Sequence, residues 1–318
     1  MSYIFIIDSP ANLNIQKDTT VHLMKEFMRQ DKEIFCCGIN DLTINEQNEV
    51  IFSCNKIKKI SNKIDLEKST TNNAKDFKTI FVRKDPPFDQ TYLNATFIMD
   101  HISNAGGNVI NPGSSLRNHN EKMGILQFSD YISPSIVSAC PSMLKKFINE
   151  NKKVILKPID GMAGNGIFMV FANEPNLNVI LETMIANDQL IMAQKFIPDI
   201  KKGDKRIILI DGEPIPYALA RIPQNNEIRA NLAKGGKGII QKISDKDMHI
   251  INTIKPYLKQ NNFRFVGIDI IGEYLTEINV TSPTGLVEIE AQSKTNFTES
   301  IVCLLYTSDA AGEGLGVD

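Results

Sequence analysis

The spacing of apolar residues changes near Asn120, and this change divides the chain into two kinds of structure. Before it, short apolar runs such as Tyr3–Ile7 alternate with segments of helical periodicity such as Tyr92–Ala105. Such alternation is typical of an α/β domain with a mostly parallel sheet. After it, strands come in hairpin pairs, as around the Asp211-Gly212 turn, which indicates α+β structure.

The remaining elements follow from the same patterns. They are a helix capped by Asp18, strands near Ile34, at Thr79–Val82 and at Asn108–Asn111, a strand pair at Val154–Lys157 and Ile167–Val170, and a hairpin from Phe265 to Val280. The segment Asn40–Lys78 is polar and rich in Lys and Asn. We therefore interpret it as a loop or excursion from the first domain.

Length and charge limit the class of protein. At about 150 residues per domain, 318 residues are enough for two or three domains with a proper core, which excludes a small disulfide scaffold. The 35 Lys and Arg against 37 Asp and Glu leave a net charge of -2, which supplies no general attraction for nucleic acid or an anionic membrane. Any polyanion must therefore be held by a local site.

The cysteines and the apolar runs indicate a cytoplasmic protein. The five cysteines have neither CxxC spacing nor a regular framework, which fits a reducing compartment. The first residues lack the basic region and long apolar run of a signal peptide. No stretch approaches the ~18 apolar residues of a membrane span.

A glycine-rich turn follows a strand that ends in a lysine. Ile155–Pro158 leads into Asp160–Ile167, which contains three glycines. Glycines let backbone N–H groups approach an anion closely, so this turn and Lys157 suit a phosphate. The spacing is neither that of a P-loop nor GxGxxG. The alternative is an ordinary hairpin turn.

Asp269, Glu277 and Asn279 are polar residues in strands that otherwise read as buried. Such side chains are costly without a partner, and their oxygens suit Mg²⁺. A two-residue turn at Gly272-Glu273 would place Asp269 and Glu277 on opposite faces. The metal interpretation therefore predicts an odd-length loop. The alternative is a polar edge hairpin facing solvent.

Several arginines complete the candidate chemistry. A two-residue turn at Asp211-Gly212 pairs Arg206 with Tyr217 and puts both on one face with Arg221, unless Pro214 and Pro216 disturb the register. Two guanidinium groups there suit a phosphate or carboxylate, although exposed strand arginines are also common.

Two further segments carry charge near glycine or proline. Arg83–Asp89 follows a buried strand at the sheet edge where α/β domains bind ligands, although surface turns have similar sequences. Arg229–Gly238 is basic and glycine-rich, suited to closing over phosphates or to being a solvated loop.

The sequence lacks the residue patterns of zinc sites and of nucleophilic catalysis. His22, His101, His119 and His249 are scattered without zinc spacing, and no GxSxG elbow or cysteine nucleophile in context is present. The chemistry must therefore rest on carboxylate, amide and basic side chains around phosphate and a metal ion.

Taken in order, these segments resemble the bacterial glutathione synthetases of the ATP-grasp superfamily. The resemblance covers Tyr3–Val302 and rests on RKDPPFD from Arg83, NEK from Asn120, LKPIDGMAG from Leu156, GDKRIILIDGEPIPYALARIP from Gly203, and DIIG with TEINVTSPTG between Asp269 and Gly285.

The resemblance implies an ATP-grasp fold behind an N-terminal α/β domain. It divides the chain into an N-terminal substrate domain (1–121), a central lid domain (122–202), a C-terminal catalytic domain (203–302) and a non-native or disordered tail (303–318). We expect the tail to add nothing to the fold, so that its deletion leaves stability unchanged and the natural C-terminal helix is missing beyond Val302. The alternative is an ordinary flexible terminus.

Residue roles carry over from the matched motifs. ATP would be bound by Lys122, Lys157, Gly161, Ala163, Gly164, Gln194, Lys195, Phe196, Ile197 and Asp204; the metal by Asp269, Glu277 and Asn279; the phosphates and acyl group by Arg206, Arg221, Arg229 and Asn231; and γ-glutamylcysteine by Arg83, Ser282, Pro283, Thr284 and Gly285. Ala163 stands where the family usually has glycine. If this position needs φ > 0, alanine costs on the order of 1 kcal/mol.

The implied reaction joins γ-glutamylcysteine to glycine with ATP and Mg²⁺, or Mn²⁺, through an acyl phosphate. We expect Ile228–Gly238 to act as a lid that orders when ATP and γ-glutamylcysteine are bound. The family resemblance also implies a homotetramer. The alternatives are another ATP-grasp carboxylate-amine ligase or an ATP-binding regulator of the same fold without turnover.

Overall fold

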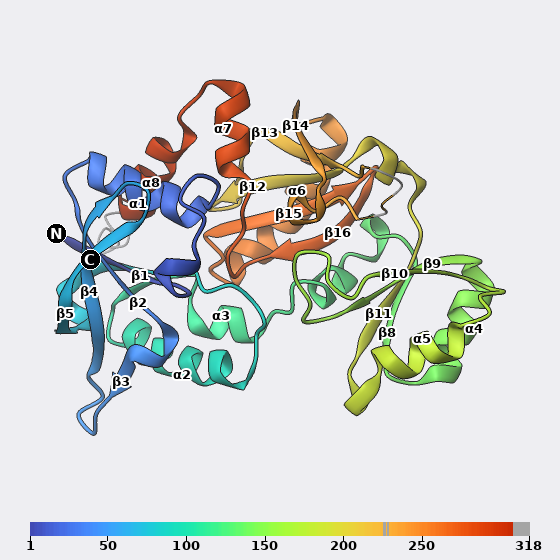
Figure 1. The fold of residues 1–318 in the computed structure, drawn as a ribbon, viewed down its shortest axis with the longest axis horizontal. Coiled ribbons are helices and arrows are strands. Elements are labelled where there is room, and N and C mark those ends of the chain that lie inside the picture. The colour runs from blue at the N-terminus through green and yellow to red at the C-terminus, as the bar shows by residue number, and fades with distance from the viewer. Residues whose placement is uncertain (225–226, 228, 308–318) are drawn as a thin grey trace, which may run out of the picture.

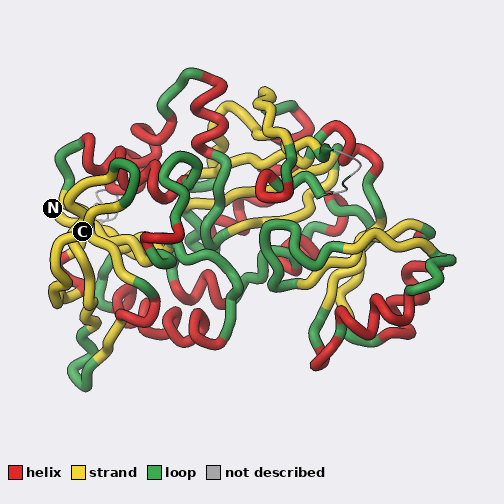
Figure 2. The backbone as a smooth tube through the Cα atoms, in the orientation of Figure 1, coloured by secondary structure: helices red, strands yellow, loops and turns green. Residues whose placement is uncertain are grey.

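The computed structural model describes residues 1–224, 227 and 229–307. Within them the chain forms three regions, each built around its own β-sheet (Figure 1). The N-terminal and central regions lie at opposite ends of the molecule, and the C-terminal region lies between them (Figures 1 and 2). The three sheets lie within the predicted ranges 1–121, 122–202 and 203–302.

The N-terminal sheet has a parallel core. Its elements are β1 (Ser2–Ile6), β2 (Glu33–Cys37), β3 (Leu42–Ile44), β4 (Val50–Ile60), β5 (Ile64–Asn73), β6 (Phe77–Val82) and β7 (Asn108–Ile110), with α1 (Thr19–Arg29), α2 (Gln90–Asn104) and α3 (Gly113–Arg117). Strands β2, β1, β6 and β7 pair in parallel in that order. This arrangement confirms the predicted α/β domain.

The interpretation of Asn40–Lys78 as a loop is wrong. This segment forms β3, β4 and β5, which extend the sheet by antiparallel pairing. Strand β4 buries Val50, Phe52 and Cys54 at every second position, while most of β5 is exposed at the sheet edge. The polar composition therefore reflects an edge strand in contact with water.

Local signals explain the helices of this region. The Asp18 carboxylate accepts hydrogen bonds from the backbone N–H groups of Thr20 and Val21 and so caps α1. Apolar residues of α1 pack on one face of the sheet, where Phe27 contacts the rings of Tyr3 and Phe5. Helix α2 belongs to the cluster on the opposite face.

The central sheet has one face in a core and the other toward the cleft. Its elements are β8 (Ser135–Ser138), β9 (Lys153–Pro158), β10 (Phe168–Phe171) and β11 (Ile191–Lys195), with α4 (Pro141–Asn151) and α5 (Leu177–Met184). Val154 and Leu156 of β9 pack against the two helices. Because side chains alternate along a strand, Ile155 and Lys157 point to the other face.

The C-terminal sheet has helices on both faces. Its elements are β12 (Asp204–Ile210), β13 (Glu213–Ile222), β14 (Lys237–Lys242), β15 (Phe265–Ile271) and β16 (Tyr274–Asn279), with α6 (Asp245–Gln260) and α7 (Leu286–Ser293). The strand order is β14-β13-β12-β15-β16, and every pair is antiparallel. Apolar residues of α6 and α7 belong to different clusters, on opposite faces of the sheet.

Two hairpin registers differ from prediction in an instructive way. Arg206 lies opposite Leu219 instead of Tyr217, because the register shifts between Ile207 and Leu209. Two extra residues on β13 fall within this shift, so the parity is kept and Arg206 and Arg221 share a face as expected.

The β15–β16 hairpin pairs Asp269 with Glu277, as the metal interpretation requires. The odd-length loop predicted to produce this pairing is wrong. Ile271 pairs with Tyr274 across a two-residue turn, and a bulge at Thr276 restores the register.

The C-terminal residues correct the predicted tail boundary. Helix α8 (Phe297–Thr307) continues past Val302, and Leu305 is fully buried among apolar residues of the N-terminal and C-terminal regions. Residues 303–307 therefore do not form a separate tail, and 308–318 lie outside the described residues. Among the described helices, none is long and apolar enough to cross a membrane.

We expect Leu305→Ala to lower the free energy of unfolding by about 2–5 kcal/mol, because it leaves a cavity in a closed core. Urea unfolding followed by circular dichroism measures this change. Leu304→Ala is the matched control, since Leu304 is 51% exposed and should change stability by no more than ~0.5 kcal/mol. Equal effects of the two substitutions would show that α8 does not pack as described.

Candidate active site

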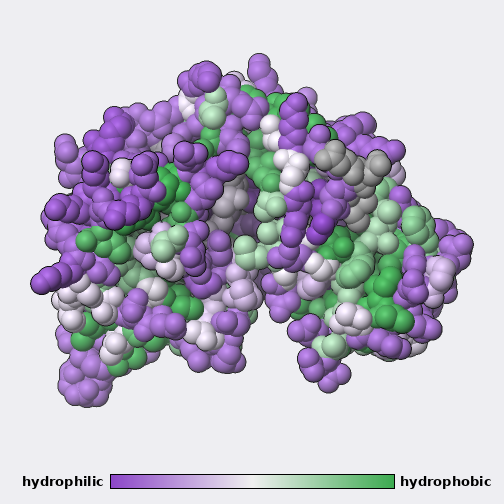
Figure 3. Space-filling model, viewed as in Figure 1, coloured by the Kyte–Doolittle hydropathy of each residue, from purple (hydrophilic) through white to green (hydrophobic). Residues whose placement is uncertain are grey.

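A cleft between the central and C-terminal sheets collects side chains from distant parts of the sequence. On the face shown in Figure 3, polar side chains cover most of the surface and the middle of the molecule is hollowed. The cleft is lined by these predicted site residues: Lys122, Lys157, Gly161, Ala163, Gly164, Gln194, Lys195, Phe196, Ile197, Asp204, Arg206, Arg221, Arg229, Asn231, Asp269, Glu277, Asn279, Ser282, Pro283, Thr284 and Gly285.

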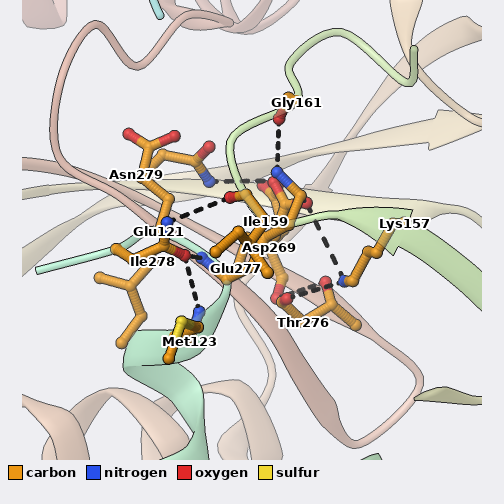
Figure 4. A network of polar contacts seen from close by, with 12 residues as sticks. Glu121, Met123, Lys157, Ile159, Gly161, Asp269, Thr276, Glu277, Ile278 and Asn279 are labelled. Carbon is orange, nitrogen blue, oxygen red and sulfur yellow. Dashed lines mark hydrogen bonds and ion pairs between the residues drawn. The ribbon is translucent and has the colours of Figure 1, made fainter. Parts of the chain in front are cut away.

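Two lysines from different regions approach one carboxylate. The Nζ atoms of Lys122 and Lys157 lie 3.8 and 4.0 Å from Glu277 Oε1, and both lysines are buried. Figure 4 shows Lys157 and Glu277. Lys157 Nζ also donates to Gln194 Oε1 and to the carbonyl oxygen of Thr276. Burial lowers the pKa of Lys157, and the Glu277 carboxylate opposes that shift. The pair of ammonium groups suits a polyphosphate chain.

The glycine-rich turn contacts Lys122 through its backbone. Lys122 Nζ donates to the carbonyl oxygen of Gly161. Ala163 has a φ of 52°, and Gly164 and Gly166 follow with φ values of 75° and 68°. Ala163 therefore has the positive φ at which alanine is less favourable than glycine, since glycine adopts this left-handed conformation more easily.

The segment before β14 touches the glycine-rich turn. A guanidinium nitrogen of Arg229 lies 3.4 Å from the carbonyl oxygen of Gly164, to which it donates. A Cβ on Gly164 would lie only 2.5 Å from Asn231 Oδ1, so glycine permits this close approach. The predicted lid Ile228–Gly238 begins at a residue that lies outside the described part of the chain. Of the described remainder, Arg229–Ala233 form part of the cleft wall.

Asp269 is held by two guanidinium groups from neighbouring strands. Arg206 donates to both of its oxygens, at 2.5 and 2.8 Å, and Arg221 Nη2 lies 2.9 Å from Oδ2. Burial disfavours the charged Asp269 carboxylate, but the two arginines hold its pKa below the usual range. Gly267 makes room for this contact, because a Cβ there would approach Arg206 Cδ to 3.0 Å and Pro283 Cβ to 2.8 Å.

Asp204 shares Arg221 with Asp269. Its Oδ2 lies 2.5 Å from Arg221 Nη2, whereas its buried Oδ1 has no hydrogen-bond partner among the described residues. Burial raises the pKa of Asp204 despite the contact with Arg221, and the nearby Asp269 and Glu277 carboxylates add to the rise. Burial opposes the charge on Arg221, but Asp204 and Asp269 keep its pKa above the ordinary value.

The oxygen donors fit a divalent ion that arrives together with phosphates. Glu277 and Asn279 share a face of β16, and Asp269 lies opposite Glu277. Asn279 donates through Nδ2 to Asp269 Oδ2, and its Oδ1 accepts no hydrogen bond within the described chain. No cluster of three or more His, Cys, Asp or Glu side chains among the described residues forms a ready metal centre. Mg²⁺ is commonly bound by one or two carboxylates plus substrate phosphates.

Arg83 differs from the other predicted residues because it lies beneath the cleft. It is 4% exposed, donates to Thr20 Oγ1 and to the carbonyl oxygen of Pro283, and stacks over Phe265. One of its guanidinium nitrogens, Nη1, has no hydrogen-bond partner among the described residues. It supports the predicted substrate loop from below.

The sequence analysis did not name every polar side chain of the cleft as a site residue. Asp85, Glu121 and Thr281 line the cleft beside the predicted set. Asp85 lies inside RKDPPFD and Glu121 inside NEK, so the motifs included both residues but did not indicate which of their side chains face the cleft.

Comparison with known proteins agrees with these motifs. Family models for the N-terminal domain and the ATP-grasp domain of prokaryotic glutathione synthetase match residues 1–117 and 121–294. The glutathione synthetase of Coxiella burnetii is 39% identical over 310 residues, covering 96% of both chains. That of Pseudomonas aeruginosa is 39% identical over 311 residues, covering 96% of this chain and 98% of the relative.

Solved structures show the same fold at low sequence identity. A D-cycloserine synthetase superposes with a TM-score of 0.68 at 11% identity, over 96% of this chain and 99% of that one. An ATP-grasp ligase of Chryseobacterium gregarium gives 0.65 at 17% identity, over 96% of each chain. With both family models and these relatives spanning nearly its whole length, the chain belongs to the prokaryotic glutathione synthetases, within the ATP-grasp ligases.

Proposed function

We propose that the cleft ligates γ-L-glutamyl-L-cysteine to glycine through an acyl phosphate, giving glutathione, ADP and phosphate. The observation that carries the proposal is the meeting of Lys122, Lys157 and Glu277 from three segments of an ATP-grasp fold. Phosphoryl transfer depends on positioning and charge neutralisation, and it needs no protein nucleophile.

We assign the cations to the phosphates. Lys122 and Lys157 contact the phosphate chain, Gly161–Gly164 covers it, and Gln194–Ile197 borders the adenine. Arg206, Arg221, Arg229 and Asn231 neutralise charge on the transferred phosphoryl and acyl groups. This assignment is supported by the cleft geometry, since Arg206 and Arg221 are already aligned by Asp269.

ATP-grasp ligases use ATP with a divalent metal. We propose Mg²⁺, with Mn²⁺ as a substitute, held by Asp269, Glu277 and Asn279. When bound, the ion neutralises charge that develops on the phosphates. The substrate loop Ser282–Gly285, which Arg83 contacts from below, is proposed to hold γ-glutamylcysteine.

We further propose a cytoplasmic homotetramer. Cys36, Cys37 and Cys54 are buried free thiols, which fits a reducing compartment. Light scattering coupled to size exclusion tests the assembly.

An acceptor screen tests the activity. ADP release should require γ-glutamylcysteine and glycine together and should yield glutathione. ADP release with a different pair of carboxylate and amine substrates would favour another ATP-grasp carboxylate-amine ligase. ATP binding without release in any pair would favour a regulatory protein of the same fold.

We expect Glu277→Gln to lower kcat on the order of 100-fold, because one anionic oxygen near the metal and both lysines is lost. Steady-state kinetics at saturating Mg²⁺ measures the loss, and an unchanged melting temperature verifies the fold. Glu273→Gln, in the exposed turn of the same hairpin, should keep parental activity. Near-parental turnover of Glu277→Gln would refute the metal assignment.

We expect a shortened lid to uncouple hydrolysis from ligation, because an acyl phosphate reacts with water unless it is shielded. Removing Gly235 and Gly236 should raise the ratio of ADP released to glutathione formed above one. Removing one residue from the exposed Ser61–Lys63 turn is the control and should keep the ratio at one. A one-to-one ratio at the normal rate in the shortened lid would contradict the role of this segment.

The same lid proposal predicts a pattern of proteolysis. The free enzyme should be cleaved within Ile228–Gly238, and ATP with γ-glutamylcysteine together should protect it. Equal cleavage with and without both ligands would oppose ordering of the lid by substrates.

A further inference from the structure

Glu121 joins the N-terminal region to the cleft and fixes the loop after β16. Its Oε1 atom accepts three hydrogen bonds, from the backbone N–H groups of Val280 and Thr281 and from Thr281 Oγ1, at 2.9, 3.1 and 2.8 Å. Its carbonyl oxygen accepts a hydrogen bond from the N–H of Ile278, which lies in β16. Three bonds at Oε1 therefore set the orientation of the carboxylate, and the backbone bond fixes the same segment.

The second oxygen of this carboxylate faces the cleft. Glu121 lines the cleft, and its Oε2 accepts no hydrogen bond within the described residues. Oε2 retains accessible surface, and the cleft is the space that Glu121 lines, so we infer that a ligand in the cleft can reach this oxygen. A fixed acceptor with an open lone pair is suited to a ligand that donates hydrogen bonds.

A charge count separates Glu121 from most other acids of the cleft. The acids that line the cleft are Asp85, Glu121, Asp204, Asp269 and Glu277. Asp204 and Asp269 contact arginines, and Glu277 contacts two lysines. Among the described residues, no basic nitrogen lies within 4.0 Å of a carboxylate oxygen of Asp85 or Glu121, although Lys84 Nζ donates to the carbonyl oxygen of Asp85. Carboxylates held in a cleft without a cation are costly unless a ligand supplies one.

The substrates of the proposed reaction carry two ammonium groups, which equals the number of unpaired carboxylates. One belongs to the γ-glutamyl end of the donor, remote from the acyl group that reacts. The other is the amine of the acceptor amino acid, which must reach the acyl phosphate. Asp85 follows β6 in the N-terminal region, whereas Glu121 directly precedes Lys122, whose Nζ lies 3.8 Å from Glu277.

We propose that Glu121 binds the ammonium group of the acceptor amino acid through Oε2, next to the site of phosphoryl transfer. The inference rests on the proposed ligation and adds to it the residue that recognises the second substrate. The three bonds at Oε1 orient this carboxylate, and the same bonds hold the loop Thr281–Gly285 that faces the donor.

Two substitutions separate recognition from loop support. In Glu121→Gln, the amide oxygen can keep the bonds from Val280 and Thr281, while an NH₂ group replaces Oε2. Only the acceptor toward the ligand is then lost. In Glu121→Ala both functions are lost, so donor binding should weaken as well.

The test compares glycine with hydroxylamine as acceptors of the acyl group. Hydroxylamine is mostly uncharged at neutral pH, so its attack on the acyl phosphate does not require a carboxylate partner. We expect Glu121→Gln to raise the KM for glycine at least about 10-fold, the loss typical of a charge-assisted hydrogen bond. Formation of the hydroxamate, and the KM values for ATP and γ-glutamylcysteine, should stay within twofold of the parent.

Controls distinguish the possible failures. Glu150→Gln, on the exposed end of α4, should leave all these constants unchanged. An unchanged KM for glycine in Glu121→Gln would overturn the inference, as would an equal loss of hydroxamate formation. A shift in Mg²⁺ dependence without a change for glycine would also overturn it, because Glu121 would then serve the metal. If the parent forms no hydroxamate from γ-glutamylcysteine and ATP, the proposed ligation itself has failed.

Discussion

The contact of Asp269 with Arg206 and Arg221 organises the cleft. Three adjacent strands, β13, β12 and β15, supply these side chains, so the guanidinium groups are aligned before any ligand arrives. Loss of one partner from such a buried cluster typically costs about 3–5 kcal/mol, because the remaining charge stays buried without compensation. The contact therefore serves both the fold of the C-terminal sheet and the position of its cations.

The segment from His119 to Met123 connects all three regions to this sheet. His119 Nε2 lies 3.0 Å from the carbonyl oxygen of Ile278, and Asn120 Nδ2 donates to Ile159 beside the glycine-rich turn. Lys122 and Glu121 then reach the cleft from the same short stretch. Burial lowers the pKa of His119, which keeps this packed ring neutral. Few residues thus hold Lys122 and the substrate loop Ser282–Gly285 in a fixed relation.

Charge balance links this architecture to the chemistry. Four cations contact three carboxylates in the cleft. Lys122 and Lys157 face Glu277, while Arg206 and Arg221 contact Asp204 and Asp269. A phosphate chain with its metal would balance the excess positive charge near these lysines and arginines. The carboxylates of Asp85 and Glu121 are an excess of negative charge, which matches the ammonium groups of amino-acid substrates.

Much of this was predictable from local pattern. The Asp18 cap and the Asp211-Gly212 hairpin depend on residues close in sequence, and both were anticipated. The strand β4 was missed although Val50, Phe52 and Cys54 alternate, because the surrounding residues are polar at an exposed edge.

By itself, then, the sequence determined the family, the α/β and α+β halves of the chain and the residue types that carry the chemistry, since these reside in short motifs and local periodicity. Tertiary structure alone decided the rest. The bulge at Thr276 that pairs Asp269 with Glu277, the burial of Leu305 against distant regions and the unpaired Oε2 of Glu121 all depend on contacts between residues far apart in the chain. Such contacts are set by packing and charge in three dimensions, which local periodicity does not encode.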